Sequence, residues 1–168
     1  MALDYNEFVT DIRTLLRANA TTTALGLSLT SDYQMASDHI NLGYSENIPV
    51  EVDRYPHIFI SLKNAEEEIA NIGIASNGVR RHVNLFVDIN AFVWVGSDSD
   101  DSDKCARSLA RNIHSVFRSN TFYSGTVGWD LALLNNTVFS RSYVEPNNRD
   151  TYLSAVRIEA RFEKKSVI

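Results

Sequence analysis

Hydrophobic and polar side chains alternate along several stretches of the chain, and a period of two residues predicts β-strands. The longest such stretch is Val79–Val95, in which every second residue from Val83 onwards is apolar. At about 3.3 Å per residue, a strand of this length would span roughly 55 Å, about three times the usual strand. We therefore expect this strand to bend or to project from the domain, and to leave part of its edge unpaired.

Shorter alternating stretches predict the other strands of a sheet. One follows Pro56, and two more, Trp129–Val144 and Thr151–Glu163, flank a turn at Glu145–Asn148. A short turn between two long strands predicts an antiparallel hairpin. The segment Glu66–Ile74 fits either a short helical turn or an edge strand.

Apolar residues at three- and four-residue spacing predict two amphipathic helices, at residues 3–19 and Asp103–Ser119. The apolar stripe of the first comprises Tyr5, Phe8, Val9, Ile12, Leu15 and Leu16, and that of the second comprises Ala106, Leu109, Ala110, Ile113, Val116 and Phe117. Charged residues, Asp11 among them, are placed on the opposite side of the first helix. The N-cap groups expected for the second helix are Asp100, Ser102 and Asp103.

The order of these elements predicts an α+β fold. We expect a mainly antiparallel sheet of about four to five strands, with two helices packed on one face and one unusually long strand or hairpin. The chain has 168 residues, which is close to the size of one domain, and it contains no internal repeat. Residues 1–168 are therefore expected to form a single domain.

Composition and charge exclude several classes of protein. With 16 basic and 21 acidic residues the net charge is −5, which argues against a protein that reads a nucleic-acid sequence through a basic face. No apolar run is long enough to span a membrane, and the N-terminus lacks the features of a signal peptide. The single cysteine, Cys105, allows no intrachain disulfide. We expect a protein that is made in a cytoplasm and has no membrane partner.

Candidate catalytic and metal-binding groups do not form a recognisable pattern. The acidic run Asp98–Asp103 fails as a calcium loop, because Asp103 and Leu109 stand where such a loop needs Gly and Glu. The four histidines lack metal-ligand spacing. Cys105 lies near the start of a predicted helix, where a thiolate is favoured, but no nucleophile signature surrounds it. We therefore expect no catalytic residue, no metal and no cofactor.

The second face of the long strand is the most distinctive surface in the sequence. Aromatic side chains alternate there with polar ones, which suits a protein interface better than solvent. A covering helix is an equally good explanation near Phe86, whereas an interface is the better one towards the end of the strand. The candidate subunit-contact residues of this strand are Phe92, Trp94, Arg80, Arg81 and Asp88.

Several segments together resemble one known family. An N-terminal amphipathic helix precedes Ile48-Pro49 and the segment Arg54–Ile60, and the segment Arg80–Ile89 leads to the second helix and two closing strands. In this order of elements and in these strand sequences, the chain resembles the tail-terminator proteins of long-tailed bacteriophages, which are also called tail-completion or neck proteins.

The resemblance implies a structural virion protein that is not an enzyme and needs no cofactor. Its subunits would form a hexameric ring that caps the tail tube and later joins the head connector. DNA would pass through the lumen without sequence-specific binding, and a net negative charge would keep the phosphate backbone from adhering. The protein would be made in the host cytoplasm and would reside in the neck of the virion.

Two alternatives remain open at the level of sequence. One is another virion protein, either a head-completion or connector subunit or a tail-tube protein. The other is a small cytoplasmic α+β enzyme or ligand-binding domain, which a deep pocket with convergent carboxylates or histidines would favour.

Overall fold

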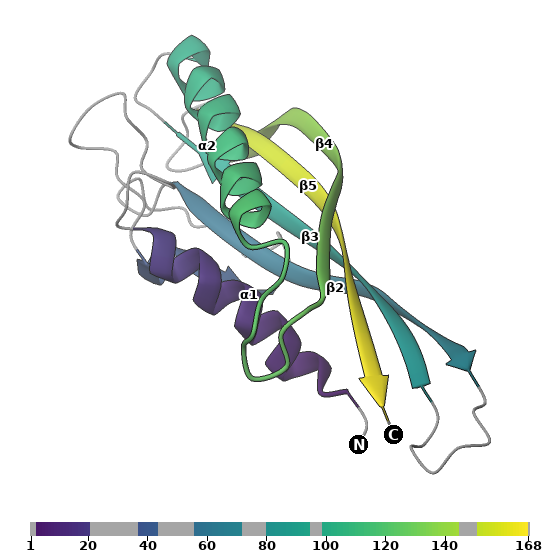
Figure 1. The fold of residues 1–168 in the computed structure, drawn as a ribbon. Helices are drawn as coiled ribbons and strands as arrows, with labels where there is room; N and C mark the ends of the chain where they lie inside the picture. The colour runs from purple at the N-terminus through teal and green to yellow at the C-terminus, as the bar shows by residue number, and fades with distance from the viewer. Residues whose placement is uncertain are drawn as a thin grey trace.

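The structure is a computed structural model that describes residues 3–20, 37–43, 56–71, 80–94, 99–144 and 151–167. Its elements are α1 (Tyr5–Ala20), the 3₁₀ turn η1 (Ser37–His39), β1 (Ile40–Leu42), β2 (His57–Asn71), β3 (Arg80–Val93), α2 (Ser99–Ser119), β4 (Leu131–Val144) and β5 (Thr151–Val167). Both long helices lie on the same face of one sheet (Figure 1). The α+β fold predicted from the sequence is confirmed.

The five strands are arranged in the order β1-β2-β3-β5-β4. The short strand β1 is parallel to β2, and every other pair is antiparallel. The antiparallel pairing of β4 with β5 confirms the predicted hairpin, whose turn lies outside the described residues. In the segment Glu66–Ile74, the structure continues β2 as far as Asn71, so the strand alternative holds there.

The prediction that the long strand leaves part of its edge unpaired is wrong. β3 is the central strand, and both of its edges are paired: β2 follows it from Phe92 to Arg80, and β5 follows it from Val93 to Arg80. The reason is that its neighbours are equally long. β2 accommodates a register shift between Leu62 and Asn64 and then continues the ladder.

The main core lies between the helices and the sheet. Leu109 and Ile113 are completely buried, which confirms the predicted phase of α2. Four aromatic side chains meet at the centre of this core, with ring centroids 4.9 to 6.2 Å apart in mostly edge-to-face contacts. These side chains are Phe8, Phe117, Trp129 and Phe162.

A buried carboxylate attaches α1 to the segment that follows α2. Asp11, which the helix pattern places on the polar side, is only 5% exposed and accepts backbone N–H bonds from Thr126, Val127 and Gly128 at 2.7 to 3.0 Å. Gly128 has a φ of +64°, and a Cβ atom there would lie 2.2 Å from the Tyr123 carbonyl oxygen. The carboxylate thus provides acceptors for amides that the turn leaves without backbone partners.

The second helix starts earlier than its sequence suggests. It begins at Ser99, so Ser102 and Asp103 lie within the helix rather than at its N-cap. Asp103 instead accepts hydrogen bonds from the Ser154 hydroxyl and from Arg141, and Ser102 is buried. Among the described helices, none combines the length and the apolar character needed to cross a membrane.

Candidate functional site

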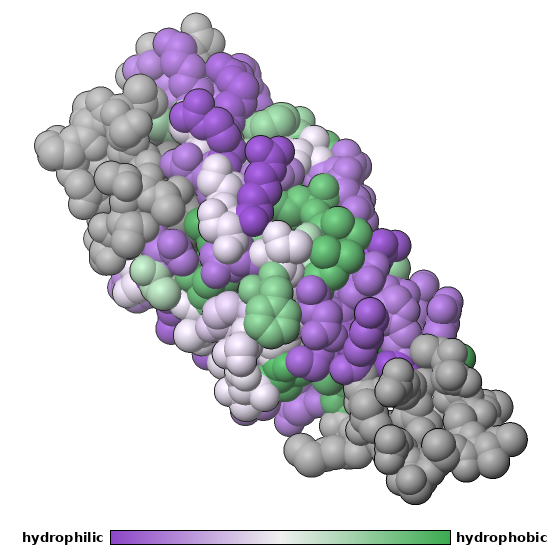
Figure 2. Space-filling model, in the orientation of Figure 1, coloured by the Kyte–Doolittle hydropathy of each residue, from purple (hydrophilic) through white to green (hydrophobic). Residues whose placement is uncertain are grey.

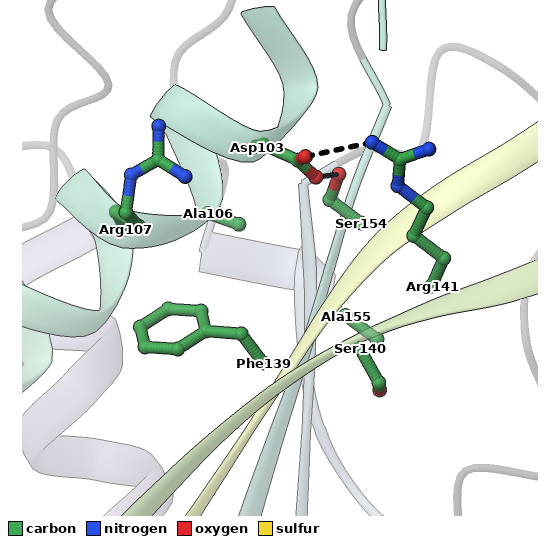
Figure 3. A pocket seen from close by; sticks show the side chains of 8 residues that line it. All are labelled: Asp103, Ala106, Arg107, Phe139, Ser140, Arg141, Ser154 and Ala155. Atoms are coloured by element: carbon green, nitrogen blue, oxygen red, sulfur yellow. Dashed lines mark hydrogen bonds and ion pairs between the residues drawn. The ribbon is translucent and has the colours of Figure 1, made fainter. Parts of the chain in front are cut away.

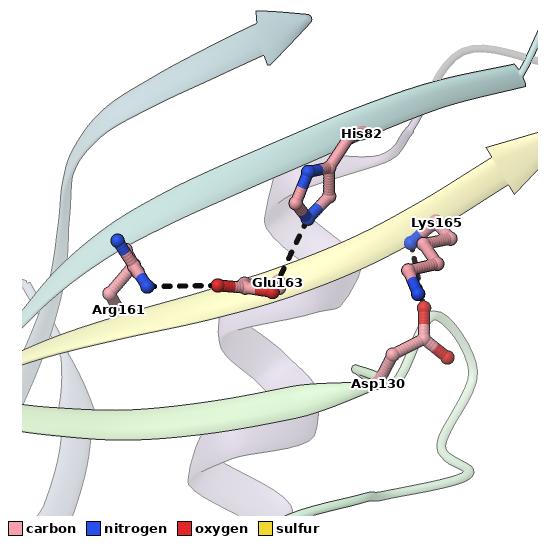
Figure 4. Close-up of polar contacts among 5 residues, drawn as sticks. All are labelled: His82, Asp130, Arg161, Glu163 and Lys165. Carbon is pink, nitrogen blue, oxygen red and sulfur yellow. Dashed lines mark hydrogen bonds and ion pairs between the residues drawn. The ribbon is translucent and has the colours of Figure 1, made fainter. Parts of the chain in front are cut away.

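The face of the sheet opposite the helices, which we call the open face, carries charges that neutralise one another. Lys63 lies 3.5 Å from Asp88 and 3.8 Å from Glu159. Further along the face, Glu163 lies 2.9 Å from Arg161 and 3.3 Å from His82 (Figure 4). These side chains alternate along neighbouring strands, as the strand period requires. The open face is therefore charged but nearly balanced.

Two of the candidate contact residues belong to a small apolar cluster on this face. Phe92 is only 4% exposed, and it packs with Phe59, Leu153 and Ala155. Its ring meets that of Phe59 edge-to-face at 6.1 Å. Phe92 is therefore covered within the chain and needs no neighbouring subunit to bury it. Trp94 packs at the margin of the cluster and remains partly exposed.

The other three candidates are not brought together with Trp94. Arg80 begins β3, and Arg81 forms an ion pair of 2.9 Å with Glu67. Asp88 lies an odd number of residues from Arg81, so the two side chains point to opposite faces of the sheet. The structure therefore does not assemble the five predicted contact residues into one surface, and their role in an interface stays a prediction.

The most open feature of the sheet is a pair of strand edges. Beyond Ala132, whose amide donates to the Thr121 carbonyl, the outer edge of β4 has no backbone partner in the described part of the chain. Likewise β1 pairs only with residues 58–60 of β2, so the outer edge of β2 from Ser61 onwards has no described strand beside it. These edges lie at opposite sides of the sheet.

Exposed hydrophobic side chains accompany both edges. Val138 is 38% exposed and Phe139 51% exposed on β4, while Ile69 is 62% exposed on β2. Figure 2 shows hydrophobic atoms gathered on the side of the molecule where β4 lies in Figure 1. Val138 and Phe139 are consecutive and point to opposite faces of the sheet, so the alternating pattern of the sequence does not mark both as exposed, and it does not reveal which strands form the edges.

A small cavity of about 180 Å³ lies between α2 and the β4–β5 pair. It is lined by Asp103, Ala106, Arg107, Phe139, Ser140, Arg141, Ser154 and Ala155 (Figure 3). The hydrogen bond from Ser154, together with the bond and charge of Arg141, holds the pKa of the Asp103 carboxyl below its usual value. This carboxylate already has its partners, and no histidine lines the cavity to activate the Ser154 hydroxyl.

Cys105 and three of the histidines are buried or packed against other side chains. Cys105 is completely buried, and burial raises the pKa of its thiol, which disfavours the reactive thiolate. His114 contacts the Thr137 hydroxyl at 2.8 Å, and burial lowers the pKa of its imidazole. His39 and His57 stack with ring centroids 5.9 Å apart. Among the described residues, no three metal-ligating side chains gather.

Comparison with known proteins adds no identification: no family model matches the chain, and no curated protein matches it. The resemblance to tail-terminator proteins therefore stays a prediction from the sequence.

Proposed function

We propose that this protein is a structural subunit that associates head-to-tail into a closed ring, and that the ring caps the tail tube of a long-tailed bacteriophage and joins it to the head. The observation that carries the proposal is a pair of strand edges on opposite sides of one sheet, β4 on one side and β2 beyond Ser61 on the other, that have no strand beside them among the described residues.

The strand directions favour head-to-tail contact. Three antiparallel pairings separate β2 from β4, so the two edge strands run in opposite directions. A second copy whose β2 edge lies beside β4 would therefore continue the antiparallel order. Such a contact joins two different surfaces, and it generates a ring when its rotation closes.

The dimensions of the two layers also favour such a repeat. Four long strands occupy about 19 Å across the sheet at the usual strand spacing. Two packed helices occupy about 16–20 Å at the usual interhelical distance. The sheet layer and the helix layer therefore repeat with nearly the same period, so neighbouring subunits could extend both layers together.

In a free monomer, these edges would favour aggregation. Long unpaired edges with exposed apolar side chains favour uncontrolled aggregation, and proteins usually protect or cover them. Burial of Val138, Phe139 and Ile69 between subunits would remove that hazard.

The position in a virion comes from the family resemblance. The resemblance implies a ring of six copies. Its partners would be the tail tube and the head connector, and DNA would pass through the ring. A head-completion or tail-tube subunit would use the same edges, and cross-linking within purified virions would distinguish these positions. The alternative of a small enzyme or ligand-binding domain receives no support from the cavity beside Asp103, because its carboxylate already has its partners.

Light scattering and electron micrographs of the purified protein test the ring. We expect the wild-type protein to form rings of uniform size, and we expect V138K/F139K and I69K each to remain monomeric with an unchanged circular dichroism spectrum. F122K is the matched control, since Phe122 is 63% exposed in the loop that precedes β4, and it should assemble normally.

Mixing the two edge variants gives a sharper result. V138K/F139K retains a native β2 edge and I69K retains a native β4 edge, so an equimolar mixture should give heterodimers but no rings. A monomeric wild-type protein would overturn the proposal, and so would rings formed by both edge variants.

A further inference from the structure

The outer surface of α2 carries a stripe of cations that the net charge of the chain conceals. Six positions of α2 from Lys104 onwards are exposed. They are Lys104, Arg107, Arg111, Ser115, Arg118 and Ser119, and we call them the α2 ridge. No acidic residue occurs in the helix after Asp103, although the whole chain has a net charge of −5. Hydrophilic atoms cover this part of the molecule in Figure 2.

The arginines of the ridge differ from the cations of the open face. Lys63, Arg157 and Arg161 each lie within 4 Å of a carboxylate. By contrast, no carboxylate of the described residues lies within 4 Å of Arg111 or Arg118, whereas Lys104 lies 3.4 Å from Asp101. Arg107 forms no ion pair at that distance either, but its charge acts on Asp103, which lines the same cavity, and helps to hold the pKa of that carboxyl below its usual value. Arg107 and Arg111 are four residues apart on the helix, so their like charges repel one another slightly, and a bound polyanion would relieve this repulsion.

The chemistry of the ridge favours phosphate over an acidic protein surface. Protein interfaces contain an apolar centre, whereas all six exposed ridge positions are Lys, Arg or Ser. These are side chains that typically contact phosphate and sugar oxygens in protein–DNA complexes. The ridge extends for about 21 Å from Lys104 to Arg118 at the usual helical rise, which is long enough to contact several successive phosphates.

We propose that the α2 ridge binds the phosphate backbone of double-stranded DNA without reading its sequence. Few cations take part, so a single subunit binds weakly and the DNA can slide. Several copies in one assembly would strengthen the contact through multivalency. The inference deepens the proposed function by naming the surface that meets DNA, and the cation stripe that carries it is independent of the strand edges.

Fluorescence anisotropy with a labelled duplex of about 30 base pairs, measured across salt concentrations of about 50 to 200 mM, tests the proposal. With four cations engaged, the logarithm of the affinity should fall with the logarithm of the salt concentration with a slope of about −3.6, and R107A/R111A/R118A should reduce the slope to about −1. Duplexes of unrelated sequence should bind equally well.

A matched variant distinguishes the loss of the ridge cations from the loss of positive charge in general. K63A/R157A/K165A removes three exposed cations from the open face, so it has the same net charge as the ridge variant and should keep the wild-type slope. Equal losses in the two variants would overturn the assignment to α2, as would a wild-type protein that does not bind the duplex.

Two further outcomes separate this inference from its alternatives. If poly-glutamate binds the ridge as tightly as DNA at equal salt, the partner is an acidic protein surface and the DNA proposal is wrong. Light scattering of the ridge variant should show normal rings. Normal rings without DNA binding would overturn this inference alone, whereas failure of the wild-type protein to form rings would overturn the proposed function.

Discussion

Asp11 illustrates how a single charged residue holds two distant segments together. It lies in the middle of α1, yet its carboxylate accepts amide hydrogen bonds from residues more than a hundred positions later. A carboxylate can accept all three bonds because both of its oxygens have free lone pairs. The helical pattern groups Asp11 with the solvent-facing residues, since an isolated acid on an amphipathic helix is usually exposed.

Replacement of Asp11 by Asn tests this arrangement. The amide has only one acceptor oxygen, and its NH₂ group would face a backbone N–H donor, so we expect the free energy of unfolding to fall by about 1–3 kcal/mol. Urea denaturation measures the loss. Glu7→Gln removes one negative charge from an exposed position of α1 and should change the stability by less than about 0.5 kcal/mol. Equal effects of the two variants would contradict the structural role of Asp11.

The partly buried imidazole of His114 is a second single residue that affects stability, and its effect depends on pH. Burial lowers its pKa in the folded protein, and the charge of Arg118 adds to this effect. The folded protein therefore favours the neutral imidazole. The stability that His114 contributes is complete above its pKa in the unfolded chain, about 6.5, and is lost as the pH falls below that value towards the lower pKa in the folded protein. Between pH 7 and pH 5 we expect the melting temperature to fall more steeply for the wild-type protein than for His114→Gln. Parallel pH profiles of the two proteins would disprove this role for His114.

At the scale of elements, α2 is the helix whose burial the sequence predicts best. Its apolar residues recur every three or four positions, and the structure buries the whole stripe. The start of the helix is less predictable, because Asp103 and Ser102 have the composition of a cap but find tertiary partners in β4 and β5 or in the core. A local sequence signal for a helix end competes with such distant contacts.

Truncation of the α2 stripe should therefore be costly. We expect Leu109→Ala or Ile113→Ala to reduce the free energy of unfolding by about 2–5 kcal/mol, because each leaves a cavity in a close-packed core. Arg111→Ala, on the exposed side of the same helix, should change stability by less than about 0.5 kcal/mol. Thermal or urea denaturation compares them, and a loss below about 1 kcal/mol for both core variants would contradict the packing described here.

At the scale of the whole molecule, the two faces of the sheet have different electrostatic roles. The open face pairs its cations with carboxylates, while Arg111 and Arg118 on the outer surface of α2 have no carboxylate within 4 Å in the described part of the chain. A net charge of −5 hides this asymmetry, because a sum over residues contains no information about position. The net negative charge therefore disfavours nucleic-acid contact for the average surface but not for the α2 ridge.

The whole domain should fold without a metal ion. The acidic loop of the sequence lacks the pattern of a calcium site, and the core is large enough to stabilise a chain of this size. We expect thermal melting curves recorded with and without a chelator to coincide. A decrease of several degrees in the presence of chelator would show that a bound ion contributes to stability.

The fold class, the apolar stripes of both helices, the hairpin of β4 with β5 and the buried face of β3 could all be predicted from the sequence alone. These features follow from local periodicity, since a residue's position within a helix or strand decides which side it faces. The central position of β3, the edges of β2 and β4 that lack a described neighbour, and the burial of Asp11 and Phe92 became evident only in the folded structure. Strand order and burial of this kind depend on which distant segments pair, and the period of a single strand is the same at the centre of a sheet and at its edge.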